Sequence, residues 1–309
     1  MIAASSIPAA GSETPASGRL QHYGLLRFSG ADGVNFLQGQ LSNDMRQLSA
    51  GSAVLAAYSS PQGRVLAILR VLPHSTGPIA ILPRELLLPT LERLGKFILR
   101  AKVRIEDAGG SLAVAGSHGR GDLQSRGIAV PEAEHGYLEH SGIGVARVSR
   151  HADRYWVIGS PERLAQHGFA GDALDAGRAE QDWRLADIRA GLPQLYAQTR
   201  ELFVAQMLNL DLVDGISFSK GCYTGQEIIA RTQHLGRIKR RLFRLLLPSA
   251  PWNIGDPLRL YDGRAGRLIE MAQTGEGVES LAVLHADTGE PELGVNATEA
   301  KQLPLPYAV

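Results

Sequence analysis

The sequence predicts an α+β protein whose last part is a small β-barrel. As far as residue 190, short apolar runs of strand character alternate with segments of helical periodicity. From Leu242 onward, short strands follow one another with Gly-containing turns between several of them and little helix. The 309 residues, 44% hydrophobic and 20% charged, are enough for two or three domains with cores of their own.

The first 18 residues are rich in Ala, Ser, Pro and Gly, and the first basic residue is Arg19. They hold no long apolar stretch, so they do not resemble a secretory signal, and we expect a disordered tail. No apolar run in the chain reaches the roughly 18 residues of a membrane span. We therefore expect no membrane partner. The net charge of +1 gives no global field for nucleic acid.

Strands in the first part of the chain are predicted from apolar and β-branched runs. The loop Ser59-Ser-Pro-Gln-Gly63 joins two of them into a β-hairpin. Residues 116–143 are rich in Gly, charge and His and are expected in loops and edges. The predicted strands are Leu20 to Phe28, Ala53 to Tyr58, Val65 to Leu72, Ile79 to Leu82, Val103 to Glu106, Leu112 to Ala115, Gly144 to Val148 and Tyr155 to Ile158.

Four helices are predicted before residue 190. One follows Ser29-Gly-Ala-Asp32, a helix start with a capping-box pattern, and one covers Arg84 to Phe97 with its Leu residues on one face. Pro161 to His167 begins with a tolerated Pro, and Glu180 to Ala190 is stopped by a following Gly and Pro. The strands of the last part are Leu242 to Leu247, Pro257 to Tyr261, Arg264 to Glu270, Ser280 to Leu284 and Glu292 to Val295.

The segment Lys220-Gly-Cys-Tyr-Thr-Gly-Gln-Glu227 combines a helix start with a thiol. Thr224 and Glu227 have the spacing of a capping box, and Tyr223 and Ile228 that of a hydrophobic staple. A helix is therefore expected to begin at Gly225 and to run toward Leu235.

Cys222 is the only cysteine of the chain. It can form neither an internal disulfide nor a multi-cysteine metal site, which favours a reducing compartment. The helix N-terminus and Lys220 both favour a thiolate there, reactive toward sulfur or an electrophile, or able to give one ligand to a shared cluster. The alternatives are a buried, inert cysteine and a Lys220 that is only a solvated surface charge. The nine His lack metal-site spacing, so no metal site is expected.

The same octapeptide resembles the signature of the YgfZ family. The likeness continues into Ile228-Ile-Ala-Arg231 and precedes it in Gly215-Ile-Ser-Phe218. Three further segments resemble family motifs in family order across roughly residues 20–241: Phe36-Leu-Gln-Gly-Gln-Leu-Ser-Asn-Asp44, Tyr58-Ser-Ser-Pro-Gln-Gly-Arg64 and Asp187-Ile-Arg-Ala-Gly-Leu-Pro193.

The resemblance implies the three-domain ring, or cloverleaf, of the glycine-cleavage aminomethyltransferase (T-protein), with a central hole that holds tetrahydrofolate. After the tail of residues 1–18, the first α+β domain would comprise residues 19–50 and 175–237, with the octapeptide. The second α+β domain would comprise residues 51–174, and the C-terminal β-barrel residues 238–309.

The resemblance also implies a factor that binds tetrahydrofolate and supports assembly or repair of iron–sulfur clusters in client proteins, including tRNA-modifying enzymes. The reduced thiol and the missing targeting signal lead us to expect a cytoplasmic location. Nucleic acid would be a partner only indirectly. Cys222 and Lys220 fall on the family's cysteine and lysine, and they are the expected catalytic residues. Folate contacts are expected at Gln38, Gln40, Asp44, Arg189, Tyr223, Gln226, Glu227 and Arg231. For Gln38, Gln40 and Asp44, helix capping and turn formation are the alternative.

An aminomethyl or one-carbon transferase is the alternative function. The T-protein carries a carboxylate on the hairpin after its first helix, but here no Asp or Glu occurs between Asp44 and Glu85. Its pterin-binding glutamate is replaced by Arg189, which can accept no hydrogen bond. Arg189 would instead meet the folate tail or a backbone carbonyl, or form an ion pair with Asp187 or Asp182.

Three interpretations of a stretch of basic residues remain: a solvated connector between domains, a strip that contacts RNA, or a site for the anionic folate tail. Arg231 is the best candidate for contact with the folate tail. Its members are Arg231, Arg237, Lys239, Arg240, Arg241 and Arg244.

Overall fold

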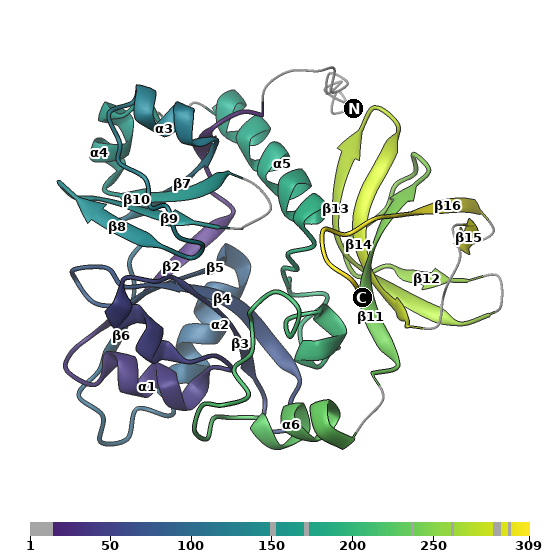
Figure 1. Ribbon diagram of the computed structural model, residues 1–309, viewed down its shortest axis with the longest axis horizontal. Helices are drawn as coiled ribbons and strands as arrows, with labels where there is room; N and C mark the ends of the chain where they lie inside the picture. Colours follow the sequence, from purple (N-terminus) through teal and green to yellow (C-terminus); the bar gives the residue numbers. More distant parts are fainter. Residues whose placement is uncertain are drawn as a thin grey trace, which may run out of the picture.

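The structure, a computed structural model, describes residues 15–148, 153–169, 173–235, 238–260, 263–286, 292–295 and 298–309. It is a mixed α/β fold with three antiparallel sheets, arranged around the long helix α5 (Ala173–Ala190; Figure 1). Among the described residues, no helix is both long and apolar enough to cross a membrane.

The first sheet has its core on both faces. Its strand order is β3-β4-β5-β2-β6. Alternate residues of one strand face opposite sides, so Leu26 joins one apolar cluster and Leu25 another. All eight residues of β4 are buried, which explains its uninterrupted apolar sequence. The strands are β2 (Tyr23–Ser29), β3 (Val54–Ser59), β4 (Val65–Leu72), β5 (Ile79–Pro83) and β6 (Arg104–Asp107).

Helices α1 (Gly33–Gln40) and α2 (Arg84–Gly95) pack against one face of this sheet through residues such as Leu37 and Leu86. Its other face packs against the second sheet, where Ile81 and Trp156 belong to one cluster. The first sheet thus runs across position 50/51, where a domain boundary was expected, because β3, β4 and β5 pair in one sheet with β2.

The second sheet has the order β1-β7-β10-β9-β8. Its outer face is covered by the short helices α3 (Arg120–Ser125) and α4 (Pro161–Gln166). Residues 116–143 were expected in loops and edges: β8 is indeed an edge strand of this sheet, whereas the helix α3 was not expected. The strands are β1 (Gly18–Arg19), β7 (Ala113–His118), β8 (Tyr137–His140), β9 (Ile143–Arg147) and β10 (Arg154–Gly159).

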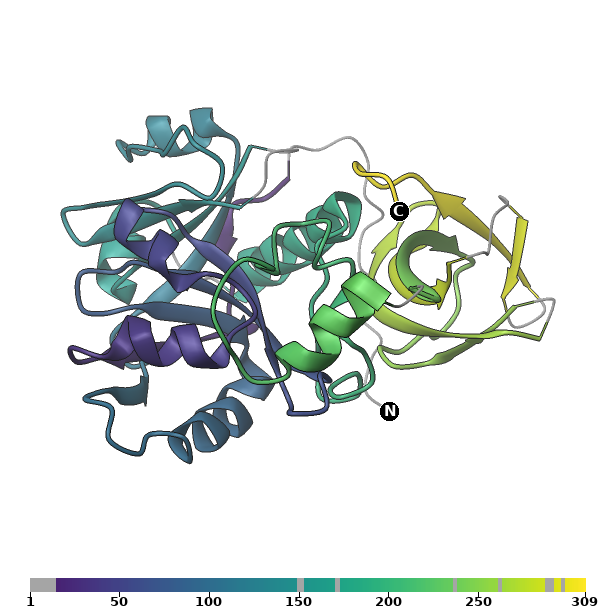
Figure 2. The ribbon, with the colours of Figure 1, turned by 60° about the horizontal axis from the view of Figure 1, so that its bottom comes forward.

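The third sheet is strongly curled, with α5 and α6 (Gln226–Leu235) between it and the rest of the molecule (Figure 2). Its order is β12-β13-β14-β11-β16-β15. No pairing within the described residues joins its edges β12 and β15, so the closed barrel expected here is not found. The strands are β11 (Arg240–Leu247), β12 (Pro257–Arg259), β13 (Ala265–Thr274), β14 (Gly277–His285), β15 (Glu292–Val295) and β16 (Thr298–Leu303).

Most predicted elements occur within a few residues of their expected bounds. Two starts differ. The described part of α5 begins at Ala173 instead of 180. At α1, the capping box is wrong: Asp32 makes no cap hydrogen bond, because its carboxylate accepts from the Lys102 backbone N–H at 2.7 Å. The expected tail of residues 1–18 lies outside the described residues as far as residue 14, and its last residue belongs to β1.

Helix α5 meets the third sheet through a buried carboxyl group. Glu270 on β13 is 2% exposed, and its carboxylate contacts the Tyr196 hydroxyl, the Arg184 guanidinium at 3.6 Å and the Met271 N–H at 3.2 Å. Burial raises the pKa of Glu270 to about 7, because the charged form loses its hydration. Near neutral pH this carboxyl group therefore titrates inside the junction.

We expect Glu270→Gln to gain stability relative to the wild type as the pH rises from 5 to 8. The unfolded carboxyl titrates near 4.5 and the folded one near 7. The folded state thus holds more protons between these values, and its stability falls as the pH rises through that window. Gln keeps the size and an acceptor for Tyr196 but has no such titration. The difference between the two proteins should change by about 1 to 3 kcal/mol.

Urea unfolding at pH 5, 6, 7 and 8 measures this change. Glu92→Gln, on the exposed side of α2, serves as the matched control and should follow the wild type at every pH. A constant difference between Glu270→Gln and wild type across the range would contradict the assignment.

Candidate functional site

The segment Lys220–Glu227 forms a loop that leads into α6 and lies against the tip of the β3–β4 hairpin. Gly225 has φ +83°, a left-handed conformation that favours glycine, and a Cβ there would lie 2.6 Å from the Ser60 carbonyl oxygen. A Cβ on Gly63 would lie 2.8 Å from Cβ of Ile228 on α6. Two glycines, one on each side, therefore allow the hairpin tip and the loop to pack backbone to backbone.

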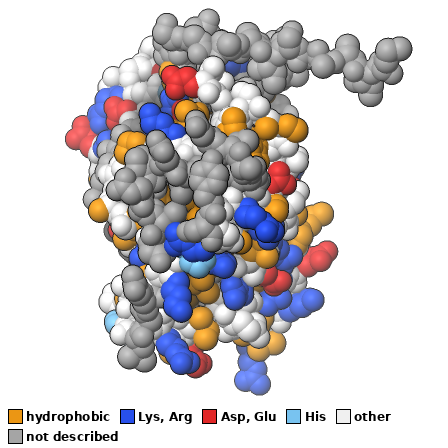
Figure 3. Space-filling model, turned by 90° about the vertical axis from the view of Figure 1, so that its right-hand side faces the viewer, with side chains coloured by type: hydrophobic (Ala, Val, Ile, Leu, Met, Phe, Trp, Pro, Cys, Tyr) orange, Lys and Arg blue, Asp and Glu red, His pale blue; other side chains and the backbone are white. Residues whose placement is uncertain are grey.

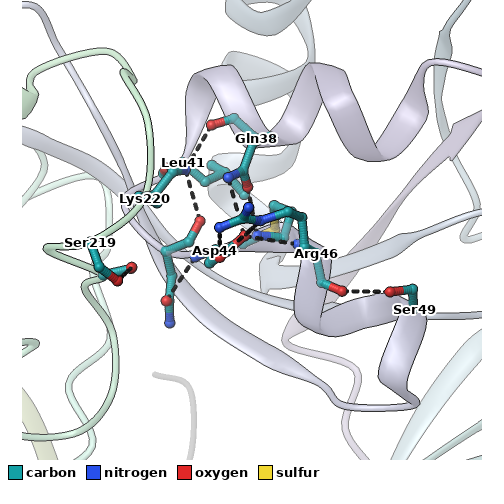
Figure 4. A network of polar contacts seen from close by, with 10 residues as sticks. Gln38, Leu41, Asp44, Arg46, Ser49, Ser219 and Lys220 are labelled. Carbon is teal, nitrogen blue, oxygen red and sulfur yellow. Dashed lines mark hydrogen bonds and ion pairs between the residues drawn. The ribbon is translucent and has the colours of Figure 1, made fainter.

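Lys220 anchors this loop to the end of α1 (Figure 4). Its ammonium donates to three backbone carbonyls, those of Gln38 at 2.6 Å, Leu41 at 2.7 Å and Asn43 at 2.8 Å. The last carbonyls of a helix have no partner within it, and an ammonium has three donors to offer. The residue is 5% exposed, and burial lowers its pKa to about 8. The interpretation of Lys220 as a solvated surface charge is therefore wrong.

Gln38 and Asp44 belong to the same network. The Gln38 amide donates to Asp44 Oδ1 at 3.1 Å and accepts from the Met45 N–H at 2.7 Å. Asp44 also accepts from the Arg46 N–H, which caps a short 3-10 helix at Met45–Ala50. Hydrogen bonds from the Arg46 guanidinium lower the pKa of Asp44 to about 2. These contacts favour the capping alternative for both residues, and their folate contacts stay predictions.

Tyr223 and Thr224 join the loop to the same end of α1. The Tyr223 ring is buried, lies 4.9 Å from the Lys220 ammonium, and has its pKa raised to about 12 by burial. The Thr224 hydroxyl lies 3.5 Å from Oε1 of Gln40. This is not the predicted capping box, and α6 begins at Gln226 instead of Gly225, because Gly225 takes the left-handed conformation.

Cys222 is a free thiol exposed at the surface. It stands between the buried Lys220 and the buried Tyr223, so the chain is held on both sides of it. The alternative of a buried, inert cysteine is wrong. Of the remaining predicted residues nearby, Glu227 and Arg231 are exposed and Gln226 is partly exposed.

Arg189 belongs to another part of the molecule. Its guanidinium, at the end of α5, pairs with Glu279 on β14 at 2.6 Å, and Glu279 also pairs with Arg244 at 2.5 Å. The ion pair predicted with Asp187 or Asp182 is wrong. The closest contacts of those two carboxylates are with other groups: Arg154 for Asp187, and the Ala16 N–H for Asp182.

Asp187 lines a cavity, a role that the sequence did not lead us to expect although Asp187 opens one of the family motifs. With Tyr23, Arg70, Trp156 and Gln194 it lines a cavity of about 30 Å³ between the first two sheets. Its carboxylate accepts from Arg154 at 2.6 Å and from the Tyr23 hydroxyl at 3.4 Å. The available signal was its place two residues before Arg189, in the segment already singled out.

One group of side chains has the composition of a metal site. Ligand atoms of Glu134, His135 and Asp214 all lie within 4.8 Å of one another. However, Nη1 of Arg70 lies 3.4 Å from Nδ1 of His135, and a guanidinium can only donate. The other ring nitrogen then carries the proton, 3.8 and 3.7 Å from the two carboxylates, and is not available as a ligand.

Comparisons with known proteins were decisive for the family. The chain is 33% identical over 307 residues to the tRNA-modifying protein YgfZ of Pectobacterium carotovorum subsp. carotovorum (strain PC1), covering 94% of this chain and 91% of that protein. The chain belongs to the YgfZ family. The tRNA-modifying protein YgfZ of Sodalis glossinidius (strain morsitans) is 34% identical over 304 residues, covering 94% and 92%. No model of a protein family matches the chain.

Among solved structures, the aminomethyltransferase T of the glycine cleavage system from Bartonella henselae has the same fold. The TM-score is 0.73 at 15% identity, and the match covers 94% of this chain and 86% of that one. The predicted relation of the YgfZ family to the T-protein is confirmed at the level of the fold.

In this YgfZ-family protein, we expect Lys220→Met to lower the free energy of unfolding by about 2 to 4 kcal/mol. The Met side chain keeps the apolar stem, but three carbonyls lose their donor, at a cost of ~1 to 3 kcal/mol for each group left unsatisfied. Part of that cost is offset because the folded variant no longer has to remove an ammonium group from water. Urea unfolding measures the loss. Lys239→Met is the control, because Lys239 is exposed. A Lys220→Met protein as stable as the control would show that the network does not hold the loop.

Proposed function

We propose that the chain is a tetrahydrofolate-binding factor that supports assembly or repair of iron–sulfur clusters in client enzymes, including tRNA-modifying ones, and that it acts through Cys222. The single observation that carries the proposal is the exposed thiol on a loop held at both sides. The printed name of the relatives, tRNA-modifying protein, supports clients of that kind.

The loop has the properties that contact with a protein-bound cluster demands. A thiol can give a ligand to iron, or receive sulfur, only where the partner's surface can approach it. Gly221 before it is exposed and has no side chain to obstruct that approach. Lys220 and Tyr223 keep the backbone in one position, so little conformational entropy is lost when a client binds. The iron–sulfur cluster is cargo here and belongs to the client.

The polar groups around Asp187 suit a pterin ring, since a carboxylate can accept its paired N–H groups. Asp187 uses two of its acceptor positions in the contacts described above. Space is the constraint: about 30 Å³ is room for a few water molecules only. Tetrahydrofolate therefore fits by chemistry and not by size unless the cavity widens, and we derive no reaction step through it.

The three sheets support a three-domain arrangement like that of the T-protein. We infer that residues 238–309 form one domain around the third sheet. The boundary between the other two falls between β6 and β7 instead of at position 50/51, because β2 to β6 pair in one sheet and β7 to β10 in another.

An aminomethyl transferase is less well supported. The hairpin strand β4, Val65–Leu72, carries no carboxylate. The arginine at the pterin-binding position, Arg189, is already paired with Glu279. The fold likeness to the T-protein, at 15% identity, concerns the fold alone.

An RNA-contacting strip is also less well supported. Within the basic stretch, Arg241 pairs with Asp211 at 2.6 Å and Arg244 with Glu279. On the face seen in Figure 3, Lys and Arg side chains are interspersed with Asp and Glu. Arg237 lies outside the described residues, whereas Arg231, Lys239 and Arg240 are exposed.

Cys222→Ala should abolish support of iron–sulfur enzymes while leaving tetrahydrofolate affinity within about twofold of wild type. The exposed thiol makes little contribution to packing, so stability should change by less than ~0.5 kcal/mol. Complementation of a strain that lacks its own YgfZ-family protein, scored by the activity of a tRNA-modifying iron–sulfur enzyme, measures the first effect. Calorimetric titration with tetrahydrofolate measures the second.

Ser49→Ala is the matched control, because Ser49 is an exposed side chain in the same part of the fold and should complement fully. Normal complementation by Cys222→Ala would overturn the role of the thiol. Failure of the wild type to bind tetrahydrofolate would overturn the folate half of the proposal.

A transferase would form methylene-tetrahydrofolate from an aminomethylated carrier and tetrahydrofolate. We expect the opposite result: the mixture should yield this product no faster with the protein than without it. Product formation at an enzymatic rate, followed by chromatography, would restore the alternative.

A further inference from the structure

A cleft of about 770 Å³ opens where the first sheet, α5 and the third sheet meet. His22 lines it from the turn before β2, Arg84 from the start of α2 and Arg184 from α5. On the side of the third sheet, Trp252 lines it from the loop between β11 and β12, and Met271 from β13. None of its lining residues belongs to the 30 Å³ cavity around Asp187. Its volume lies within the range of sites for small organic ligands.

Two guanidinium groups give the cleft a positive wall. Arg184 is 29% exposed in its side chain and is held in place by Glu270 at 3.6 Å and by the ring of Tyr196 at 5.5 Å. Arg84 is exposed, and the one hydrogen bond of its guanidinium that the described residues contain runs from Nε to the Gln21 carbonyl at 3.2 Å. Its terminal nitrogens remain as donors for a ligand. The carboxylate in the wall, Glu85, accepts from the Ala197 N–H at 2.7 Å.

His22 adds a buried polar group without a hydrogen-bond partner. Its side chain is 10% exposed, and neither ring nitrogen has such a partner among the described residues. Nδ1 lies 3.5 Å from the carboxylate of Glu180. Nε2 has neither a hydrogen-bond partner nor an ion-pair contact among the described residues. A buried polar atom left unpaired costs free energy, and in a ligand site the ligand commonly provides the partner.

The third sheet and its β11–β12 loop supply apolar lining to the cleft. Trp252 is partly buried against the core of that sheet, and its indole N–H donates to the Pro248 carbonyl at 2.9 Å. The ring is thereby fixed. Met271, which also packs on this core, belongs to the same lining. A fixed indole and a thioether are favourable surfaces for a planar ring.

We propose that this cleft is a second ligand site, which binds a small organic anion with its carboxylate or phosphate group between Arg84 and Arg184, near His22, and its ring against Trp252. The assignment does not depend on Cys222 or on folate at Asp187.

Calorimetric titration of the full chain with two probes tests the site: benzene-1,3-dicarboxylate for a carboxylate and phenyl phosphate for a phosphate. At least one should bind with a dissociation constant below about 1 mM, and the probe that binds more tightly identifies the anionic group. Arg84→Gln should weaken that probe at least about tenfold, as expected for the loss of a charge-assisted contact. Trp252→Leu should weaken it about fivefold or more.

Arg163→Gln, at an exposed position on α4 outside the cleft, should bind as the wild type does, and so should Cys222→Ala. If Arg84→Gln fails to fold, Trp252→Leu decides. Absence of binding by both probes at 10 mM would overturn the site, as would an equal loss in Arg163→Gln. Displacement of the probe by tetrahydrofolate in a competitive titration would also overturn it, because the cleft would then be the folate site.

Discussion

The buried ammonium of Lys220 is the interaction on which the functional region depends. A cation is costly to remove from water, and the cost is offset here because the ammonium donates hydrogen bonds to three carbonyls, that of Gln38 in the last turn of α1 and those of Leu41 and Asn43 just after it. Those carbonyls need a donor that α1 cannot supply, so the helix and the loop each satisfy the other's polar groups. The position of Cys222, two residues further on, follows from this pairing. Lys220 therefore holds the thiol loop in position, and its catalytic role stays a prediction.

The octapeptide can now be understood residue by residue. Lys220 and Tyr223 point inward and fix the backbone, whereas Gly221 and Cys222 between them face the solvent. Gly225 takes a left-handed turn pressed against the hairpin tip, where a larger residue would collide with a carbonyl. Glu227 then stands in the first turn of α6, where a negative charge is favourable to the helix dipole. In this short segment, buried residues that fix the backbone stand on both sides of exposed ones. A surface thiol of defined position requires such an arrangement.

The sequence was sufficient for most elements and for the family, because apolar periodicity and the octapeptide are local signals. It was insufficient where the deciding partner is distant along the chain. The burial of Lys220 depends on carbonyls about 180 residues away, and the partner of Arg189 is Glu279, 90 residues away. Local patterns also predicted two capping boxes that do not form. The Asp32 carboxylate accepts from the Lys102 N–H instead, and the Thr224 hydroxyl contacts the Gln40 amide. Closure of the third sheet could not be decided from strand spacing, since spacing does not specify which edges pair.

The junction between α5 and the third sheet is built on a different principle from the thiol loop. There the polar groups do not simply hold two elements together, since Glu270 is buried with a carboxyl that titrates near neutral pH, and Arg184 is shared between it and an open cleft. A core selected for stability alone would place an apolar residue at this position. A buried titratable group, and a guanidinium that contacts it and also lines a large cleft, lower the stability of the fold. Proteins commonly keep such destabilising groups at functional sites. The loop with Cys222 and the junction of α5 with the third sheet therefore differ in role. The loop presents a thiol in a fixed position, and the junction keeps polar groups available to a ligand.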